Sequence, residues 1–136
     1  MNLQTDIDAL RGHALNCAIA TELGWIQDHD DYWIDDKNHL RCIGDSCWIH
    51  QDGMTFDPAH DPTDSWTLDG DGWHWSYYER YEQHNTNNSA WLEMKMCAIG
   101  KYAEAEVTLP FADFASKAEA HATARCIVWL KARGIK

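Results

Sequence analysis

The sequence predicts an α/β fold of the α+β type, with a mostly antiparallel sheet of four or five strands. Apolar residues recur at helical spacing near both ends of the chain, and alternating patterns occur between them. We expect the N- and C-terminal helices to pack on one face of the sheet. Whether a short third layer covers the other face stays open. A chain of 136 residues without repeats or a flexible linker is expected to form a single domain over residues 1–136.

The first helix is predicted to begin after Thr5, a residue type that caps helices, and to end before Gly24. Cys17 falls within its apolar stripe, so a core position explains this cysteine better than a catalytic one. The stripe is expected to contain Leu3, Ile7, Leu10, Ala14, Cys17, Ala18 and Thr21.

A hairpin is predicted over residues 39–50, with a two-residue turn at Gly44-Asp45. Its cysteines and histidines have the ligand chemistry of a zinc site, but the hairpin would direct the two residue types to opposite faces. We therefore favour a buried pair of reduced cysteines. The expected apolar face holds Leu40, Cys42, Cys47 and Ile49, and the opposite face holds His39, Arg41, Trp48 and His50.

A short helix is predicted after residue 60. Asp61 is a typical helix cap and Pro62 a typical first helical residue, and the run Asp69-Gly70-Asp71-Gly72 would end the helix. This run favours a solvated turn over a calcium loop, because Trp73 and Arg80 occupy positions where a calcium loop has ligands.

Alternating patterns predict three further strands. The first covers residues 73–81 and places its aromatic residues Trp73, Trp75 and Tyr77 on one face. The other two form a hairpin with a turn at Gly100-Lys101, which pairs Lys95 with Glu106. The apolar face of this hairpin is expected to contain Leu92, Met94, Met96, Ala98, Ala103, Ala105, Val107 and Leu109.

The last helix is predicted to begin at Pro110 and to run to about Arg133, with Gly134 as its stop. His121 and Arg125 would flank its buried stripe. The stripe is expected to contain Phe111, Phe114, Ala115, Ala118, Ala122, Cys126 and Trp129.

The negative charge of the chain is concentrated in its first part. The net charge is −11, and residues 1–82 carry 17 acidic and 4 basic residues, whereas residues 83–136 carry 5 and 7. Residues 28–71 hold twelve aspartates against only Lys37 and Arg41. This distribution disfavours direct binding of DNA, RNA or anionic membranes and favours a basic partner.

A cytoplasmic location is predicted. The start of the chain lacks the basic and apolar regions of a signal peptide, and no apolar run approaches the roughly 20 residues of a membrane span. Five cysteines at irregular spacing fit reduced thiols better than a disulfide framework.

Three segments carry a resemblance to a known family. They are Leu15-Asn16 through Leu23-Gly24-Trp25, then Phe56-Asp57-Pro58-Ala59-His60-Asp61-Pro62-Thr63-Asp64, then Thr108-Leu109-Pro110-Phe111-Ala112. In these segments and in the order of its predicted elements, the chain resembles the phage ABA-sandwich family of small phage and prophage proteins. The family pattern has a longer helix after the second segment, where this chain has Gly70 and Gly72. The resemblance implies a phage accessory protein and supplies no catalytic residues.

Charge and resemblance together predict a non-enzymatic accessory protein that inhibits a host factor in the host cytoplasm. The expected partner is a basic host protein, such as a nucleic-acid-binding defence component, captured by an acidic aromatic surface that mimics nucleic acid. Tryptophans in such a surface add cation–π contacts to the partner's basic residues. The surface is expected to contain Asp30, Asp31, Asp35, Asp36, Trp48, Asp57, Asp61, Asp64 and Trp66.

Two alternative functions stay open. A small-ligand binder could sequester a nucleotide signal by stacking its base on aromatic residues. A metal-dependent hydrolase would use the Asp/His-rich segments, none of which has the spacing of a known metal signature. No catalytic residue, metal site or cofactor is predicted, and a homodimer stays open. The alternative ligand site is expected to contain Trp73, Trp75, Tyr77, Arg80 and Lys101.

Overall fold

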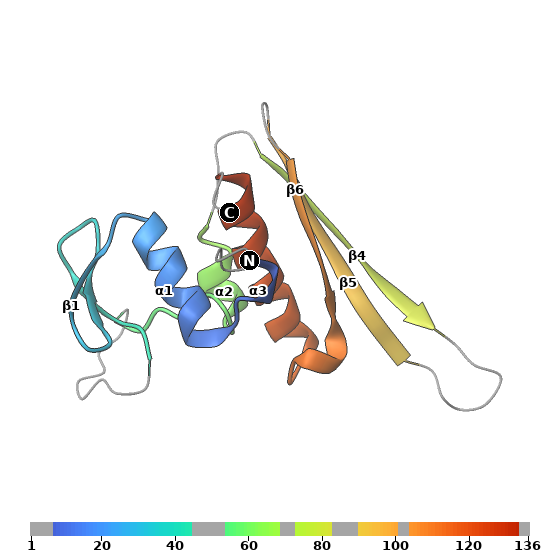
Figure 1. Cartoon of the computed structure of the whole chain (residues 1–136), viewed down its shortest axis with the longest axis horizontal. Helices are drawn as coiled ribbons and strands as arrows, with labels where there is room; N and C mark the ends of the chain where they lie inside the picture. Colours follow the sequence, from blue (N-terminus) through green and yellow to red (C-terminus); the bar gives the residue numbers. More distant parts are fainter. Residues whose placement is uncertain (1–6, 45–53, 69–72, 83–89, 101–103, 134–136) are drawn as a thin grey trace, which may run out of the picture.

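The computed structural model places α-helices between two three-stranded antiparallel sheets, which is an α+β arrangement (Figure 1). It describes residues 7–44, 54–68, 73–82, 90–100 and 104–133. The small sheet consists of β1 (Ile26–His29), β2 (Tyr32–Ile34) and β3 (Leu40–Cys42). The large sheet consists of β4 (His74–Glu82), β5 (Ala90–Ile99) and β6 (Glu104–Pro110). The α-helices are α1 (Gly12–Glu22), α2 (Pro62–Ser65) and α3 (Lys117–Ala132).

The predicted single sheet of four or five strands was wrong in its layout. β1, β2 and β3 form a local meander that lies on the opposite side of the helices from the large sheet (Figure 1). Two tight turns close the meander, one through Asp30 with a φ of 49° and one through Asn38 with a φ of 64°. Aspartate and asparagine tolerate this left-handed conformation better than most residues. Because of these turns, the three strands β1, β2 and β3 pair with each other and form a sheet separate from the large sheet.

α3 lies at the centre of the fold, with β5 and β6 on one side and α1 and α2 on the other (Figure 1). Every residue from Ala122 to Leu130 is buried, because neighbouring elements cover the helix all round. The predicted one-sided stripe was therefore too narrow, and two of its members, Ala115 and Ala118, are exposed.

The C-terminal helix does not begin at Pro110 as predicted. Pro110 ends β6, and Phe111–Asp113 forms a short 3-10 turn before the helix. The Oγ atom of Ser116 accepts a hydrogen bond from the Glu119 N–H at 3.2 Å, and the Glu119 carboxylate accepts one from the Ala115 N–H at 3.2 Å. This reciprocal pairing satisfies two backbone donors at the helix start and fixes where α3 begins.

The face assignment predicted for the β5–β6 hairpin is confirmed, but its register is not. Lys95 lies opposite Thr108, not opposite Glu106 as predicted. Side chains alternate with a period of two along a strand, so this shift by two residues leaves the described side chains on their predicted faces. Ala103 lies outside the described residues. The Nζ atom of Lys95 still lies 3.0 Å from the Glu106 carboxylate. The buried residues of this face are Met94, Met96, Ala98, Ala105, Val107 and Leu109.

α1 begins later than predicted and buries a different face. The chain forms a 3-10 turn at Ile7–Ala9 and then breaks, so the predicted continuous helix after Thr5 is wrong. The break changes which residues point inward, and the predicted core residues Ala14 and Thr21 are exposed. Gly24 follows the helix with a φ of 87°, which confirms the predicted stop. The buried residues of α1 are Leu15, Asn16, Ile19 and Ala20.

The prediction for the cysteines is corrected at Cys42. β3 pairs with β2, and the second half of the predicted hairpin, residues 45–50, lies outside the described residues. Cys42 is buried as predicted, but it is disulfide-bonded, so it offers no thiolate to a zinc ion. The other described cysteines, Cys17, Cys97 and Cys126, carry free thiols.

Candidate functional site

The small sheet carries a row of three aliphatic side chains, of which the two outer ones are exposed and the central one is half-buried. Ile26 on β1 lies opposite Ile34 on β2, which lies opposite Leu40 on β3, so the three residues form one line across the sheet. Ile26 is 70% exposed and Leu40 is 37% exposed. We call these three residues the apolar row. Large contiguous apolar surfaces on proteins often mark interaction sites, whereas single exposed side chains do not.

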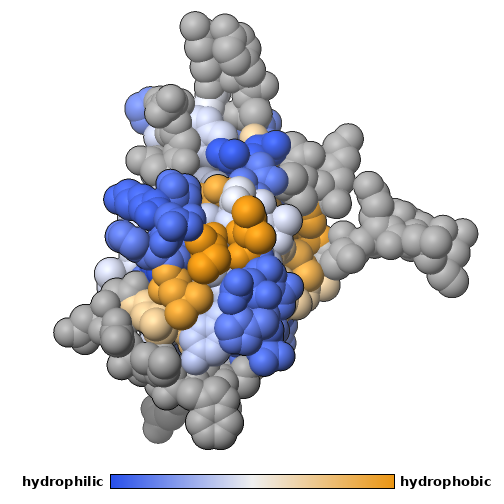
Figure 2. Space-filling model, turned by 90° about the vertical axis from the view of Figure 1, so that its left-hand side faces the viewer, coloured by the Kyte–Doolittle hydropathy of each residue, from blue (hydrophilic) through white to orange (hydrophobic). Residues whose placement is uncertain are grey.

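Exposed acidic side chains lie on the same small sheet as the apolar row and in its turns. Asp28 lies on β1, Asp30 in the turn that follows it and Asp36 just beyond β2, and all three are exposed. Figure 2 looks onto this end of the molecule and shows apolar surface with hydrophilic surface on both sides. We call these three aspartates the acidic border. Lys37 is the exposed base beside it.

Asp35, predicted as part of the binding surface, holds the turn between β2 and β3. Its Oδ1 atom accepts hydrogen bonds from the backbone N–H groups of Lys37 at 2.9 Å and His39 at 2.8 Å. Burial alone would raise the pKa of this carboxyl group, but these bonds and the nearby Arg41 guanidinium outweigh burial and lower its pKa. Only 5% of the side chain is exposed, so Asp35 has a structural role.

Arg41 points to the opposite face of the small sheet, toward the core. Its guanidinium carbon lies 4.9 Å from the ring centre of Trp25 and 5.3 Å from that of Phe56. Its Nε atom donates a hydrogen bond to the carbonyl of Met54 at 3.1 Å. These contacts hold one of the two basic residues of residues 28–71 on the face opposite the apolar row.

Three further predicted aspartates stabilise the loop before α2. Asp57 accepts a hydrogen bond from the buried Asn16 side chain at 2.7 Å, and its own N–H donates to Asp64 at 2.9 Å. Asp61 caps α2 by accepting from the Thr63 N–H at 2.9 Å, which confirms the predicted helix start. Burial of the Asp64 carboxyl raises its pKa, and the nearby Asp61 charge adds to that effect.

The same loop bears on the metal-site alternative. Asp57 and His60 belong to one of the Asp/His-rich segments that a metal-dependent hydrolase would use, but Oδ1 of Asp57 and Nδ1 of His60 lie 2.9 Å apart and bond to each other. Within the described ranges, no group of three or more His, Cys, Asp or Glu side chains is placed to hold a metal ion.

A cysteine, a histidine and an aspartate meet where α1 faces the β1–β2 turn. Cys17 Sγ lies 3.6 Å from His13 Nε2, and the same nitrogen lies 3.3 Å from Asp31 Oδ1. A nucleophilic triad uses both ring nitrogens, one toward the nucleophile and one toward the carboxylate. Burial and the Asp31 charge also raise the pKa of Cys17, which disfavours the thiolate. The geometry therefore does not activate this thiol.

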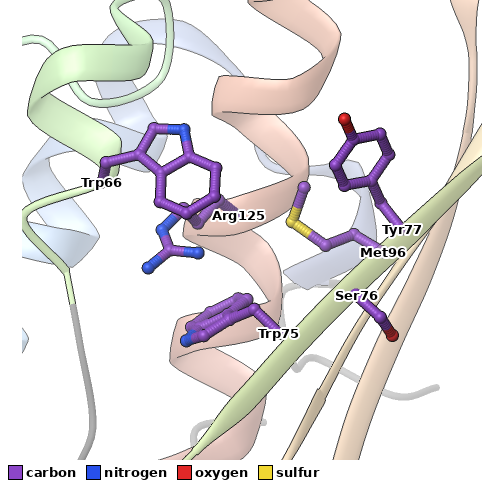
Figure 3. A pocket seen from close by; sticks show the side chains of 6 residues that line it. All are labelled: Trp66, Trp75, Ser76, Tyr77, Met96 and Arg125. Atoms are coloured by element: carbon purple, nitrogen blue, oxygen red, sulfur yellow. The ribbon is translucent and has the colours of Figure 1, made fainter.

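A pocket of about 290 Å³ opens between α2, α3 and β4. Figure 3 shows the guanidinium of Arg125 lying between the indole rings of Trp66 and Trp75, with Tyr77 and Met96 across the pocket. The guanidinium carbon is 4.1 Å from the Trp66 ring centre and 3.8 Å from that of Trp75. The lining residues are Trp66, Trp75, Ser76, Tyr77, Met96 and Arg125.

Only two residues of the predicted ligand site lie in this pocket, Trp75 and Tyr77. Trp73 instead covers Gly100, where a Cβ atom would lie 2.5 Å from its indole nitrogen. Arg80 pairs with a glutamate across the sheet, and Lys101 lies outside the described residues. The alternation of aromatic residues along β4 predicted that these two side chains lie on the same face of the strand, and both line the pocket.

Sequence reasoning missed the other principal lining residues of the pocket. Trp66 had been assigned to the acidic surface, and Arg125 had been placed beside a helix stripe. The two residues meet only because α2 packs on α3, and their contact spans 59 positions of the chain. No local pattern signals such a contact. Of the remaining predicted surface residues, Asp31 faces His13 and Trp48 lies outside the described residues.

None of the protein families, curated proteins or solved structures compared with this chain matches it. In the described part of the chain, every helix is too short or too polar to cross a membrane.

Proposed function

We propose that this chain is a non-enzymatic binding protein that docks a basic protein partner on the apolar row and its acidic border. The observation that carries the proposal is the exposure of the apolar row: Ile26 is 70% exposed while aligned with Ile34 and Leu40 across three strands. A partner that covers an exposed isoleucine gains about 1.5–3 kcal/mol for full burial of that side chain.

Charge supports a basic partner over a neutral one. The acidic border places three exposed carboxylates on the small sheet and its turns, while Arg41 stacks on the core side of the sheet. A protein with lysines and arginines around an apolar spot would meet complementary charge at the rim of this surface. Rim charges of this kind mainly accelerate association and make it depend on salt, whereas burial of apolar surface supplies affinity.

The resemblance to phage ABA-sandwich proteins suggests which partner class this is. A phage accessory protein acts on proteins of the bacterial host, and a host protein that binds nucleic acid presents the required basic surface. We propose a basic host defence component as the partner, inhibited by occupation of its nucleic-acid-binding surface. The proposal uses the exposed residues Asp30 and Asp36 of the expected surface and leaves Asp35, Asp57, Asp61 and Asp64 in their structural roles.

Affinity capture from a bacterial lysate with three immobilised variants tests the proposal. An apolar variant carries Ile26→Ser and Leu40→Ser, and a charge variant carries Asp28→Asn, Asp30→Asn and Asp36→Asn. Asparagine is suited to position 30, because the φ of 49° is tolerated by that residue type. The matched control carries Tyr78→Ser and Ile99→Ser, which remove residues of 61% and 52% exposure from the large sheet.

A basic protein retained by the wild type and the control, but lost by both other variants, is the expected result. Retention by the wild type should weaken as salt is added, since screening shortens the Debye length to about 3 Å at 1 M. Equal retention of the same proteins by the wild type and the apolar variant would refute the proposal.

A further inference from the structure

We infer that the pocket between α2, α3 and β4 is a second binding site, which takes one planar aromatic ring system such as an unphosphorylated purine base or nucleoside. This site is separate from the docking surface. The apolar row lies on the small sheet, whereas the pocket is lined by residues of the large sheet, α3 and the end of α2. The two sheets lie on opposite sides of the helices (Figure 1).

The pocket has two walls of different character. One wall is a column in which Trp66, Arg125 and Trp75 stack on each other, and the other wall consists of Tyr77 and Met96 (Figure 3). A flat occupant between the walls would touch aromatic or thioether surface on both sides. Stacking on aromatic side chains and contact with methionine sulfur are favourable for rings of many kinds.

Both walls are held in place without an occupant. Arg125 is only 3% exposed, and it donates hydrogen bonds to the carbonyls of Ser65 and Leu68 at 3.0 Å each. These bonds fix the guanidinium, which in turn supports both indole rings. Preorganised walls reduce the ordering cost of binding, because the side chains that touch the ligand are already fixed.

Tyr77 is also held, although 54% of it is exposed. Its ring packs edge-on against His121 with ring centres 4.6 Å apart. His121 Nε2 lies 2.7 Å from one oxygen of Glu79, and Lys117 Nζ lies 2.6 Å from the other. This chain of contacts fixes the position of the tyrosine wall.

Size and charge define the class of ligand. A volume of about 290 Å³ lies at the lower end of ligand pockets, so it suits one ring system and its sugar, not a dinucleotide. The cation that lines the pocket, Arg125, is buried between two indole rings and already donates to the carbonyls of Ser65 and Leu68. Lys117, beyond the tyrosine wall, is engaged with Glu79. A phosphate group therefore adds no affinity.

Calorimetric titration of the full chain with adenosine, guanosine, AMP and GMP tests the inference. The key variants are Tyr77→Ala and Tyr78→Ala, which form a matched pair of neighbouring tyrosines with 54% and 61% exposure. Tyr77 lines the pocket, whereas Tyr78 points to the other face of the sheet, 5.9 Å from Lys95. A second pair is Trp66→Ala and Trp91→Ala, with 57% and 47% exposure.

At least one nucleoside is expected to bind, and its monophosphate is expected to bind no more tightly. Tyr77→Ala and Trp66→Ala should each weaken binding by about tenfold or more, which is the typical effect of losing one stacking partner. Tyr78→Ala and Trp91→Ala should leave the affinity within about twofold of the wild type. No heat of binding with any of the four compounds would overturn the inference, and so would equal weakening by both members of a pair.

Discussion

Replacing Asn16 with alanine should destabilise the fold more than any exposed substitution on α1. Asn16 is 4% exposed and connects α1 to the loop before α2 through two hydrogen bonds. Its Nδ2 atom donates to the Asp57 carboxylate at 2.7 Å, and its Oδ1 atom accepts from the Ala59 N–H at 2.8 Å. Alanine removes both bonds and leaves the buried Ala59 N–H without this acceptor.

The expected loss is about 3 kcal/mol of unfolding free energy. A buried donor left unsatisfied costs about 1–3 kcal/mol, and a hydrogen bond to a charged group contributes about 1.5–3 kcal/mol. Both contributions come from the same side chain and are not independent, so the expected loss is smaller than the sum of the two upper values. For a domain of this size, a loss of about 3 kcal/mol lowers the melting temperature by about 10 °C.

Thermal and urea unfolding followed by circular dichroism measure this loss. Thr21→Ala is the matched control, because Thr21 is exposed on the same helix and bonds only to a carbonyl one turn earlier. The control should change the unfolding free energy by no more than about 0.5 kcal/mol. A change of less than about 1 kcal/mol for Asn16→Ala would refute the structural role assigned to the Asp57 loop.

Three further predictions concern charge and close packing. The folded state raises the pKa of Asp64 above its unfolded value of 3.8, so ionisation of Asp64 opposes folding at neutral pH. Asp64→Asn keeps an acceptor for the Asp57 N–H and should raise the melting temperature at pH 7, with the gain disappearing as the pH falls toward 3.8. The hydrogen bond from Lys117 lowers the pKa of Glu79 below 4.5, so Glu79→Gln should cost about 1 kcal/mol at pH 7. Urea unfolding at a series of pH values should show that the loss of unfolding free energy caused by Glu79→Gln shrinks as the pH falls through the pKa of Glu79 in the folded state. A loss that does not change with pH would contradict the role of this ion pair. Gly100→Ala should cost about 1–3 kcal/mol, because its methyl group would overlap Trp73, and an unchanged melting temperature would contradict this packing.

The parts of the fold that sequence predicts well are those set by local rules. The buried face of β5 and β6 follows from alternation alone, and the start of α2 follows from an Asp-Pro pair that satisfies the first backbone donors. The register of the β5–β6 hairpin was not predicted correctly, because register depends on the length of the loop. A shift of two residues leaves the alternation of apolar and polar residues unchanged, so the pattern could not reveal it. The later start of α3 was signalled by Ser116 and Glu119, a capping box that Pro110 obscured.

The small sheet was harder to predict. β1 and β2 have only four and three residues, and Asp28 and His29 occupy the second half of β1, so it shows no apolar alternation. The composition shows that this region is negatively charged, but it does not show which aspartates are structural and which are exposed for binding. Asp35 and Asp61 close a turn and cap a helix, whereas Asp30 and Asp36 are exposed in the turns of the small sheet. Only the three-dimensional partners of each carboxylate distinguish structural from surface aspartates.

The pocket illustrates the same limit for long-range contacts. Trp75 and Tyr77 were predicted on one face of a strand, since alternation places them there. The other two principal lining residues come from the end of α2 and from α3, and nothing in the local sequence brings Trp66 to Arg125. The pocket became visible only once the packing of α2 on α3 was known.

The central claim is that a basic partner covers the small sheet. Hydrogen exchange followed by mass spectrometry tests it directly, with the wild-type chain measured alone and in complex with the purified basic protein that depends on Ile26 and Leu40 for capture. We predict slower exchange over residues 26–40 in the complex and unchanged exchange over residues 91–99 of the large sheet. Protection confined to the large sheet, with residues 26–40 unchanged, would contradict the claim.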